Sequence, residues 1–308
     1  MEIGALIVAA GMSRRMGGFK PMLSIGSISI AQRVIATLSQ AGISKIVMVT
    51  GYNATALERH LAGNGLIFLR NEDYEKTQMF DSVKIGLEYL HGKCDKLLFT
   101  PVDVPLFTAK TVKTILDSGA PLACPVCDGK QGHPILMADA LIPEILADCG
   151  EQGLKGAIDR CSIPLQRIDV DDPGTIHDAD TPEDLSWLLE HHNSQLVRPV
   201  VGVSLSKEKP FFDSRTATLL MLIDETKSVR AAGQRMQLSY SSCWNMIRTL
   251  ESQLSFPLIE RSQGGPGGST SVLTDRGRLL LERYNAYEKK LKELSAELYG
   301  DYFGGLFE

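Results

Sequence analysis

The segment Leu6-Ile-Val-Ala-Ala-Gly11-Met-Ser-Arg-Arg15-Met-Gly-Gly-Phe-Lys20-Pro-Met-Leu23 carries the strongest structural signal in the chain. Its apolar run is typical of a buried strand, and this run ends in the small residues Ala9, Ala10 and Gly11. Small side chains let backbone N–H groups approach a phosphate chain closely. Arg15 and Lys20 follow at a spacing suited to neutralising such a chain. The segment therefore predicts a strand that leads into a phosphate-binding loop.

Short apolar runs alternate with amphipathic stretches from this segment to about residue 190. The alternation predicts an α/β fold whose mainly parallel sheet is covered by helices on both faces. Ligands of such sheets bind outside the carboxyl ends of the strands, which is where the small-residue loop begins. The expected strands are Ile3–Ala9, Lys45–Thr50, Leu66–Leu69, Lys96–Thr100, Leu122–Val126 and Leu165–Val170. The expected helices are Ile30–Ala41, Thr55–Leu61, Phe80–Leu90, Ala109–Ser118 and Thr181–His191.

Composition and charge limit the class of protein. With 308 residues, of which 44% are hydrophobic and 22% charged, the chain has room for two ordinary globular domains. The net charge is −5, and the first 210 residues carry the whole acidic excess. A strongly basic nucleic-acid binder is thereby excluded, so a DNA-binding surface must be local. The apolar N-terminus lacks a basic leader and the six cysteines form no disulfide pattern, so we expect a cytoplasmic protein.

The alternating pattern ends at His191–Pro210, whose polar residues and prolines are typical of a linker. We therefore expect a first domain at 1–194, a linker at 195–210 and a second domain at 211–308. One additional strand could lie in the linker region, at Leu196–Leu205.

The second domain has the pattern of a winged helix-turn-helix and is mostly helical. After a helix at Leu219–Glu225, Ser228 is placed to cap a helix at Val229–Met236, and a turn leads to a recognition helix at Tyr240–Leu250. Its apolar residues predict a small core made of Ala231, Ala232, Met236, Leu238, Trp244, Ile247 and Leu250. The polar residues left for DNA phosphates and base edges are Ser239, Tyr240, Ser241, Ser242, Asn245 and Arg248.

A β-hairpin wing is expected after the recognition helix. Phe256–Arg261 and Val272–Thr274 would form its strands around the glycine-rich tip Gly264–Thr270. Arg261 lies on this wing and joins the candidate DNA-binding residues. A long helix from Asp275 to Leu298 closes the domain.

The first domain resembles the MobA/MocA-like nucleotidyltransferases that act on molybdopterin, which have the Rossmann-like nucleotide-diphospho-sugar transferase fold. Besides the opening segment, the resemblance rests on Asn71-Glu-Asp-Tyr74, Ser82-Val-Lys-Ile-Gly86-Leu, Thr100-Pro-Val-Asp103-Val-Pro105, Gly132-His133-Pro134 and Asp180-Thr-Pro-Glu-Asp184.

This resemblance implies the transfer of a nucleotidyl group to molybdopterin, with Arg15, Lys20 and Asp103 as catalytic residues. Asp103 and Asp180 would hold Mg²⁺, and His133 would bind the acceptor. The implied nucleotide-binding residues are Ala9, Ala10, Gly11, Arg15, Lys20, Asn71 and Ser82. The Ala-Ala-Gly sequence is similar to that of the cytidylyltransferase branch and favours CTP as the substrate.

The chain departs from the family pattern at two single residues and in one short segment. Val102 and Gln78 replace glycines, and Ser27–Ile30 replaces the usual Gly-Lys-Pro-Leu. Two interpretations therefore stay open: an active transferase, or a domain that only senses nucleotide or cofactor.

The second domain resembles the DNA-binding domains of ModE and LysR-type regulators. The matching segments are Ser228-Val-Arg-Ala-Ala, Leu238-Ser-Tyr, Ile247-Arg-Thr-Leu-Glu, Pro257-Leu-Ile-Glu-Arg261 and Leu273-Thr-Asp-Arg-Gly277. The resemblance implies double-stranded DNA as a partner and a homodimer formed through the C-terminal helix. Together the two resemblances imply a bifunctional protein, with molybdenum hydroxylase apoenzymes as further partners.

Overall fold

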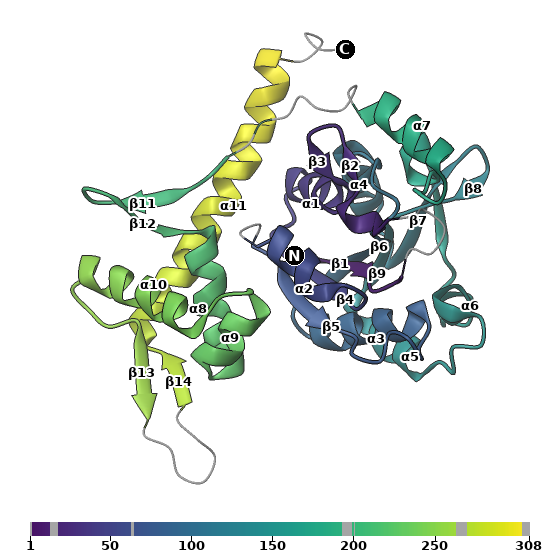
Figure 1. Cartoon of the computed structure of the whole chain (residues 1–308). Coiled ribbons are helices and arrows are strands. Elements are labelled where there is room, and N and C mark those ends of the chain that lie inside the picture. Colours follow the sequence, from purple (N-terminus) through teal and green to yellow (C-terminus); the bar gives the residue numbers. More distant parts are fainter. Residues whose placement is uncertain are drawn as a thin grey trace. The chain divides into compact units, whose positions relative to one another are not determined.

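The computed structural model describes residues 2–12, 18–62, 65–192, 199, 201–262 and 270–303. The chain forms two compact units (Figure 1). Unit 1 consists of Met1–Leu61 and Leu66–Arg198, and unit 2 consists of Ala62–Gly65 and Pro199–Glu308. No helix among the described residues is long and apolar enough to cross a membrane. All six cysteines are free thiols, as the sequence predicted.

Unit 1 is built on one mixed sheet whose centre is β1 (Ile3–Ala9). Parallel pairing joins β1 to β4 (Lys45–Thr50) and β6 (Lys96–Pro101) on its two sides. The strand order is β10 (Gln166–Asp169), β7 (Leu122–Cys127), β9 (Ile135–Ala138), β6, β1, β4 and β5 (Ile67–Arg70), with β8 (Lys130–Gln131) paired to β7. Only β9 and β8 run antiparallel to their neighbours, so the predicted mainly parallel α/β sheet is confirmed.

Helices cover both faces of this sheet, as Figure 1 shows, with α1 and α4 on one face and α3, α5 and α6 on the other. The helices are α1 (Ile30–Gln40), α2 (Ala54–His60), α3 (Met79–Leu90), α4 (Ala109–Asp117), α5 (Ile142–Ala147), α6 (Gly153–Asp159) and α7 (Pro182–His192). The five helices expected from the sequence are present, each within one residue of its predicted bounds. The short elements β9, α5 and α6 were not predicted, because four to seven residues carry little periodicity.

A helix cap and a close packing contact position α1 and α3 beside the sheet. Ser29 begins α1 with a capping box, in which its Oγ accepts from the Gln32 N–H at 3.2 Å. Helix α3 lies directly on β1 because Gly86 faces Leu6, and a Cβ at Gly86 would overlap the Leu6 side chain. The family-like Ser-x-x-x-Gly pattern therefore has a packing function at its glycine.

Unit 2 contains a helix-turn-helix followed by a two-stranded wing. Its helices are α8 (Ser214–Thr226), α9 (Val229–Arg235), α10 (Tyr240–Gln253) and α11 (Asp275–Phe303), and the antiparallel wing pairs β13 (Ile259–Ser262) with β14 (Thr270–Leu273). Ser228 caps α9 as predicted, accepting from the Ala231 N–H at 3.2 Å. Most of the predicted wing tip, residues 263–269, lies outside the described residues.

The predicted linker contains structure that packs on unit 2. Strands β11 (Ser204–Ser206) and β12 (Pro210–Asp213) form an antiparallel hairpin. Phe212 is buried against Tyr284 of α11, with ring centroids 4.8 Å apart, and the Tyr284 hydroxyl donates to the Val203 carbonyl at 2.8 Å. The second half of the segment 195–210 therefore packs as part of unit 2.

Candidate functional site

A cavity of about 210 Å³ opens at the carboxyl end of β1. Four segments that are distant in sequence form it: the end of β1, the 3-10 helix η1 (Lys20–Met22), the end of β6 and the loop before α3. The lining residues are Val8, Ala9, Ala10, Gly11, Lys20, Pro21, Tyr74, Thr77, Gln78, Met79, Ser82, Pro101, Val102 and Asp103. This is the sheet edge at which the sequence placed the ligand.

Lys20 joins two carboxylates on the charged side of this cavity. Its ammonium group donates to Asp180 and lies 3.7 Å from Oδ2 of Asp103, while the residue is only 8% exposed. The backbone brings the two acids together, since the Ala179 N–H donates to the Asp103 carbonyl at 2.8 Å. Asp184 in turn accepts from the N–H groups of Asp180 and Thr181, which orders the loop before α7.

Negative charge is in excess around Lys20. Burial raises the pKa of Asp103, and the charge of Asp180 adds to this effect while Lys20 opposes it. Burial also raises the pKa of Asp178, with further contributions from Asp180 and Asp103. Among the residues that the structure describes, the carboxylates of Asp103, Asp178 and Asp180 thus influence one another around Lys20, an arrangement that a further cation would stabilise.

The donor set at Asp103 and Asp180 suits a hard divalent cation. Within the described part of the chain, no group of three or more His, Cys, Asp or Glu side chains could hold a metal ion. Two carboxylates alone are the usual protein contribution to a Mg²⁺ site, in which substrate phosphates and waters complete the shell. The pair therefore fits a cation that binds together with a nucleotide.

On the opposite side of the cavity an amide network orders the loop before α3. Asn71 is 4% exposed, and its Nδ2 donates to Ser82 Oγ at 2.9 Å and to Thr77 Oγ1 at 2.8 Å. Its Oδ1 accepts from the Asp73 N–H at 3.1 Å. Ser82 and Thr77 line the cavity, whereas Asn71 bonds to them from outside its lining and itself lines a second cavity, described below. Asn71 therefore supports the wall of the cavity.

Gly51 and Tyr52, which follow β4 at the same sheet edge, were not predicted as part of the site. A Cβ at Gly51 would lie 2.7 Å from Tyr74 Cβ and 2.8 Å from the Ala10 carbonyl, so only glycine fits between them. Tyr52 packs edge-on against Phe19 and Tyr74, with ring centroids 5.6 and 6.2 Å away. Their position directly after a parallel strand was the signal that could have revealed them.

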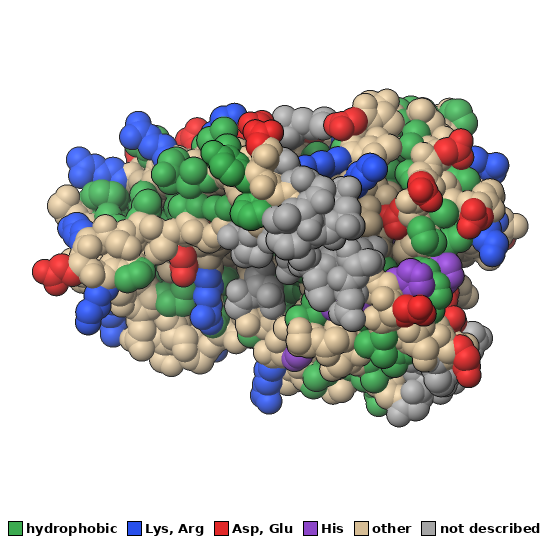
Figure 2. Space-filling view, turned by 90° about the horizontal axis from the view of Figure 1, so that it is seen from above, with side chains coloured by type: hydrophobic (Ala, Val, Ile, Leu, Met, Phe, Trp, Pro, Cys, Tyr) green, Lys and Arg blue, Asp and Glu red, His purple; other side chains and the backbone are tan. Residues whose placement is uncertain are grey.

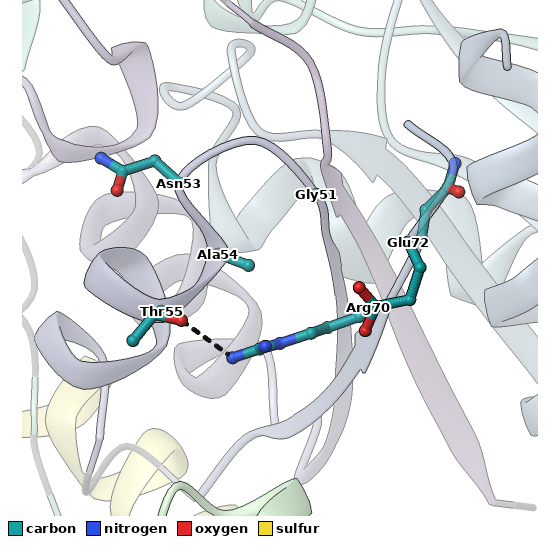
Figure 3. Close-up of a pocket in the computed structure, with 7 residues that line it drawn as sticks. Gly51, Asn53, Ala54, Thr55, Arg70 and Glu72 are labelled. Carbon is teal, nitrogen blue, oxygen red and sulfur yellow. Dashed lines mark hydrogen bonds between the residues drawn. The ribbon is translucent and has the colours of Figure 1, made fainter. Parts of the chain in front are cut away.

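A second cavity of about 280 Å³ lies at the ends of β4 and β5 (Figure 3). Arg70 runs along it and donates to Thr55 Oγ1 at 3.3 Å, the contact drawn in Figure 3. Two further bonds, of 2.9 and 2.6 Å, join Arg70 to the fully buried carboxylate of Glu58. Because Glu58 neutralises Arg70, this larger cavity lacks the charge pattern of the first, and we place the chemistry at Lys20.

Two further residues were predicted for this site, Arg15 and His133. Arg15 lies outside the described residues. His133 is not among the residues that line the 210 Å³ cavity. Burial lowers the pKa of His133 to about 4, with an opposing contribution from the Phe99 backbone, and its ring packs edge-on against Phe99.

The first candidate DNA-binding residues lie at the start of α10, Asn245 and Arg248 follow along the same helix, and Arg261 lies on β13. Ser239 caps the helix by accepting from the Ser242 N–H at 3.1 Å, and Tyr240 is 51% exposed. Ser241, Ser242, Asn245 and Arg248 are exposed as well. Of the residues predicted to form the core, Ala232, Met236, Ile247 and Leu250 are buried, whereas Ala231, Leu238 and Trp244 are only partly buried. The Trp244 ring lies beneath the guanidinium of Arg261. On the face drawn in Figure 2, the Lys and Arg side chains of unit 2 are spread out, consistent with its balanced charge.

Comparison with protein families assigns both units. Residues 5–165 match the model of the MobA-like NTP transferase domain, and residues 215–278 match that of the bacterial regulatory helix-turn-helix proteins of the LysR family. The molybdenum cofactor cytidylyltransferase of Escherichia coli K12 is 28% identical over 197 residues, which cover 62% of this chain and 97% of the relative.

Unit 2 and the fold of unit 1 have further relatives. The DNA-binding transcriptional dual regulator ModE of E. coli K12 is 33% identical over 79 residues, which cover 26% of this chain and only 30% of that regulator. The solved structure of Rv0371c from Mycobacterium tuberculosis H37Rv is similar in fold, with a TM-score of 0.53, 21% identity and coverage of 62% and 98%. That protein has also been solved in complex with manganese, at a TM-score of 0.50 and 20% identity, with coverage of 62% and 99%.

Proposed function

The chain belongs to the family of MobA-like NTP transferase domains, and we propose that unit 1 is a molybdenum cofactor cytidylyltransferase. In the proposed reaction a phosphate oxygen of molybdopterin attacks the α-phosphorus of CTP. The bond from that phosphorus to the β-phosphate oxygen breaks, and pyrophosphate leaves with the electron pair. The products are a cytosine dinucleotide of the cofactor and pyrophosphate.

This proposal rests on one observation: Lys20 contacts both Asp103 and Asp180 beside the 210 Å³ cavity. Nucleotidyl transfer requires alignment of the phosphates and neutralisation of their charge more than it requires covalent help from the protein. Lys20 supplies a buried positive charge beside the cavity. Asp103 and Asp180 would hold Mg²⁺, which when bound supplies further positive charge to the phosphate oxygens.

The remaining residues of unit 1 orient the nucleotide and the acceptor. Backbone N–H groups of Ala9, Ala10 and Gly11 face the phosphates, and Arg15 contributes a second positive charge. Ser82, held by Asn71, fixes the wall beside the nucleoside. His133 contacts the acceptor. The Ala9-Ala10-Gly11 sequence is similar to that of the cytidylyltransferase branch, and on this resemblance we expect CTP to be favoured over GTP.

Unit 2 carries a LysR-family helix-turn-helix, and we propose that the same chain regulates transcription as a homodimer. Exposed apolar side chains run along α11 and would pair with a second copy: Leu279, Tyr287, Leu294, Leu298, Tyr302 and Phe303. The α10 residues Ser239, Tyr240, Ser241, Ser242, Asn245 and Arg248, with Arg261 from the wing, would contact double-stranded DNA. Molybdenum hydroxylase apoenzymes would receive the finished cofactor.

Gln78 favours a second function, in which unit 1 only senses nucleotide or cofactor. Gln78 lines the cavity and its N–H donates to Asp81 at 2.8 Å, so a side chain stands where the family pattern has glycine. A cavity narrowed in this way could bind a ligand without aligning it for transfer.

One incubation separates these functions. The full chain is mixed with molybdopterin cofactor, Mg²⁺ and equal amounts of labelled CTP and GTP, and both dinucleotide and pyrophosphate are measured. We expect the cytosine dinucleotide and one pyrophosphate for each. A guanine dinucleotide would move the assignment to guanylyl transfer, and bound nucleotide without pyrophosphate would support the sensor.

A further inference from the structure

Two aromatic side chains of α10, Tyr240 and Trp244, contact each other, and each also contacts an arginine. Tyr240 and Trp244 are one helical turn apart and meet edge-on, with ring centroids 6.1 Å apart. The guanidinium of Arg261, from wing strand β13, lies 3.5 Å from the centroid of the Trp244 ring. At the other end the guanidinium of Arg230, from α9, lies 5.7 Å from the Tyr240 ring. These four side chains thus connect the wing, the recognition helix and the helix before it.

The Arg261 contact leaves the hydrogen-bonding edge of its guanidinium available. Stacking on an indole uses the face of this planar group, so the N–H donors around its rim stay free to bind an anion. Arg261 is exposed and has no acidic partner among the residues that the structure describes. In the same unit Arg235 and Arg278 are paired with Glu225 and Asp224. Arg261 is therefore held in place without being neutralised.

A separate contact anchors the root of the wing. The Glu251 carboxylate, also on α10, accepts from the N–H groups of Leu258 and Ile259 at 2.8 and 3.2 Å. The wing is therefore attached to the recognition helix by Glu251 even without the Trp244 ring. Attachment of the wing therefore does not require Trp244, whose ring contacts the Arg261 side chain.

The indole N–H of Trp244 supports this division of roles. It is buried and finds no hydrogen-bond partner within the described residues. A buried donor without an acceptor is unfavourable, so hydrogen bonding does not explain a tryptophan at this position. The contact of its flat ring with the Arg261 guanidinium does explain a tryptophan there.

We propose that Trp244 is a positioning residue for DNA binding, which holds the Arg261 guanidinium so that its N–H edge meets a DNA phosphate. The proposal rests on the DNA-binding function of unit 2. It names Trp244, a residue that contacts no DNA itself, as a determinant of affinity for any duplex, whatever its sequence, because phosphate contacts carry no base information.

The test measures binding of the full chain to a fluorescent mixed-sequence duplex of about 40 base pairs at several KCl concentrations. Arg261→Ala should weaken binding and lower the slope of log K against log [KCl] by about one for each protomer. Trp244→Leu should weaken binding about 3- to 10-fold, while Trp244→Phe, which keeps a ring and removes the unpaired donor, should stay within about twofold of wild type. Lys207→Ala, which removes an exposed charge between β11 and β12, is the matched control for general charge loss.

A double mutant distinguishes positioning from a merely structural role. If Trp244 acts through Arg261, then Trp244→Leu/Arg261→Ala binds no more weakly than Arg261→Ala alone. The inference would be overturned if the double variant lost as much affinity as the product of the two single losses. It would also be overturned if Trp244→Phe bound the duplex as weakly as Trp244→Leu. Thermal melting of each variant identifies loss of folding, and a Trp244→Leu defect that follows its melting temperature also counts against the proposal. If the wild-type chain binds no duplex at all, the DNA-binding function fails and this inference with it.

Discussion

The nucleotide site of unit 1 and the DNA-binding face of unit 2 are built in opposite ways. In unit 1 the functional side chains Lys20, Asn71 and Ser82 are buried, and protein partners already hold them. The candidate residues of α10 are exposed, and so is Arg261 of β13, whose guanidinium lies over the Trp244 ring. A small ligand that must be aligned for reaction needs a rigid enclosure, whereas a duplex covers an open surface by itself. Single substitutions should therefore have larger effects in unit 1.

The largest effect is expected for Lys20→Gln. Removing this ammonium takes away the positive charge that pairs with Asp103 and Asp180 and that would face the phosphates, so transfer should fall about 100- to 1,000-fold. The rate of pyrophosphate release measures it. Lys45→Gln is the matched control, because Lys45 is similarly buried and paired with Glu2 but lies away from the cavity. Equal losses in both variants would show that burial of a lysine, and not the site, is what matters.

A smaller effect, on folding, is expected for Gly86→Ala. The added methyl group meets the Leu6 side chain where α3 packs on β1, and overpacking of this kind should lower the free energy of unfolding of unit 1 by about 2 kcal/mol. Each unit has one of the two tryptophans. In a Trp244→Phe background, the fluorescence of Trp187 therefore reports the unfolding of unit 1 by urea. Gly11→Ala serves as the control, since a Cβ there meets nothing within 4 Å. An unchanged midpoint for Gly86→Ala would contradict the packing argument.

His133 predicts a pH dependence of stability in unit 1. Its pKa is lowered to about 4 in the folded chain, whereas an unfolded histidine titrates near 6.5. Above pH 6.5 neither state is protonated and the residue has no effect. As the pH falls towards 4, only the unfolded state takes up the proton, and stability drops by about 1–2 kcal/mol between pH 6.5 and 5. His133→Gln should remove this part of the slope, and an identical slope in both proteins would refute it.

The smallest effect is expected at the DNA-binding face. Arg248→Ala removes one of several exposed contacts, so binding to a mixed-sequence duplex should weaken by only about 1 kcal/mol, with a salt slope reduced by about one for each protomer. Fluorescence anisotropy in a KCl series measures both quantities. A loss as large as that of Lys20→Gln in the transfer assay would show that this face is as tightly preorganised as the cavity.

The same contrast explains what could be predicted from the sequence. The central strands and the longer helices follow from hydrophobic periodicity, and the helix-turn-helix follows from spacing and from the Ser228 cap. The convergence of Lys20, Asp103 and Asp180 was expected from motif resemblance, and the Ala179 to Asp103 backbone bond accomplishes it.

What the sequence did not predict depends on contacts between distant residues. Gly51 must be glycine because Tyr74 and Ala10 approach it, and neither neighbour is visible from its own segment. The sequence offered a strand at Leu196–Leu205, which β11 overlaps only at its end. The packing of this segment on unit 2 was not predicted, because Phe212 and the Val203 carbonyl contact Tyr284 about seventy to eighty residues later. Trp244 has the spacing of a core residue, and only the wing folding back reveals its contact with Arg261.

The central claim is that two separate regions of one chain carry two separate functions, and a crossed assay of Asp103→Asn and Arg248→Ala tests it most directly. Each variant is measured for formation of the cytosine dinucleotide and for binding to the mixed-sequence duplex. We predict that Asp103→Asn loses transfer by at least about 100-fold and binds DNA like wild type, while Arg248→Ala shows the reverse pattern. Transfer by Asp103→Asn within a few fold of wild type would remove this carboxylate from the mechanism and contradict the account.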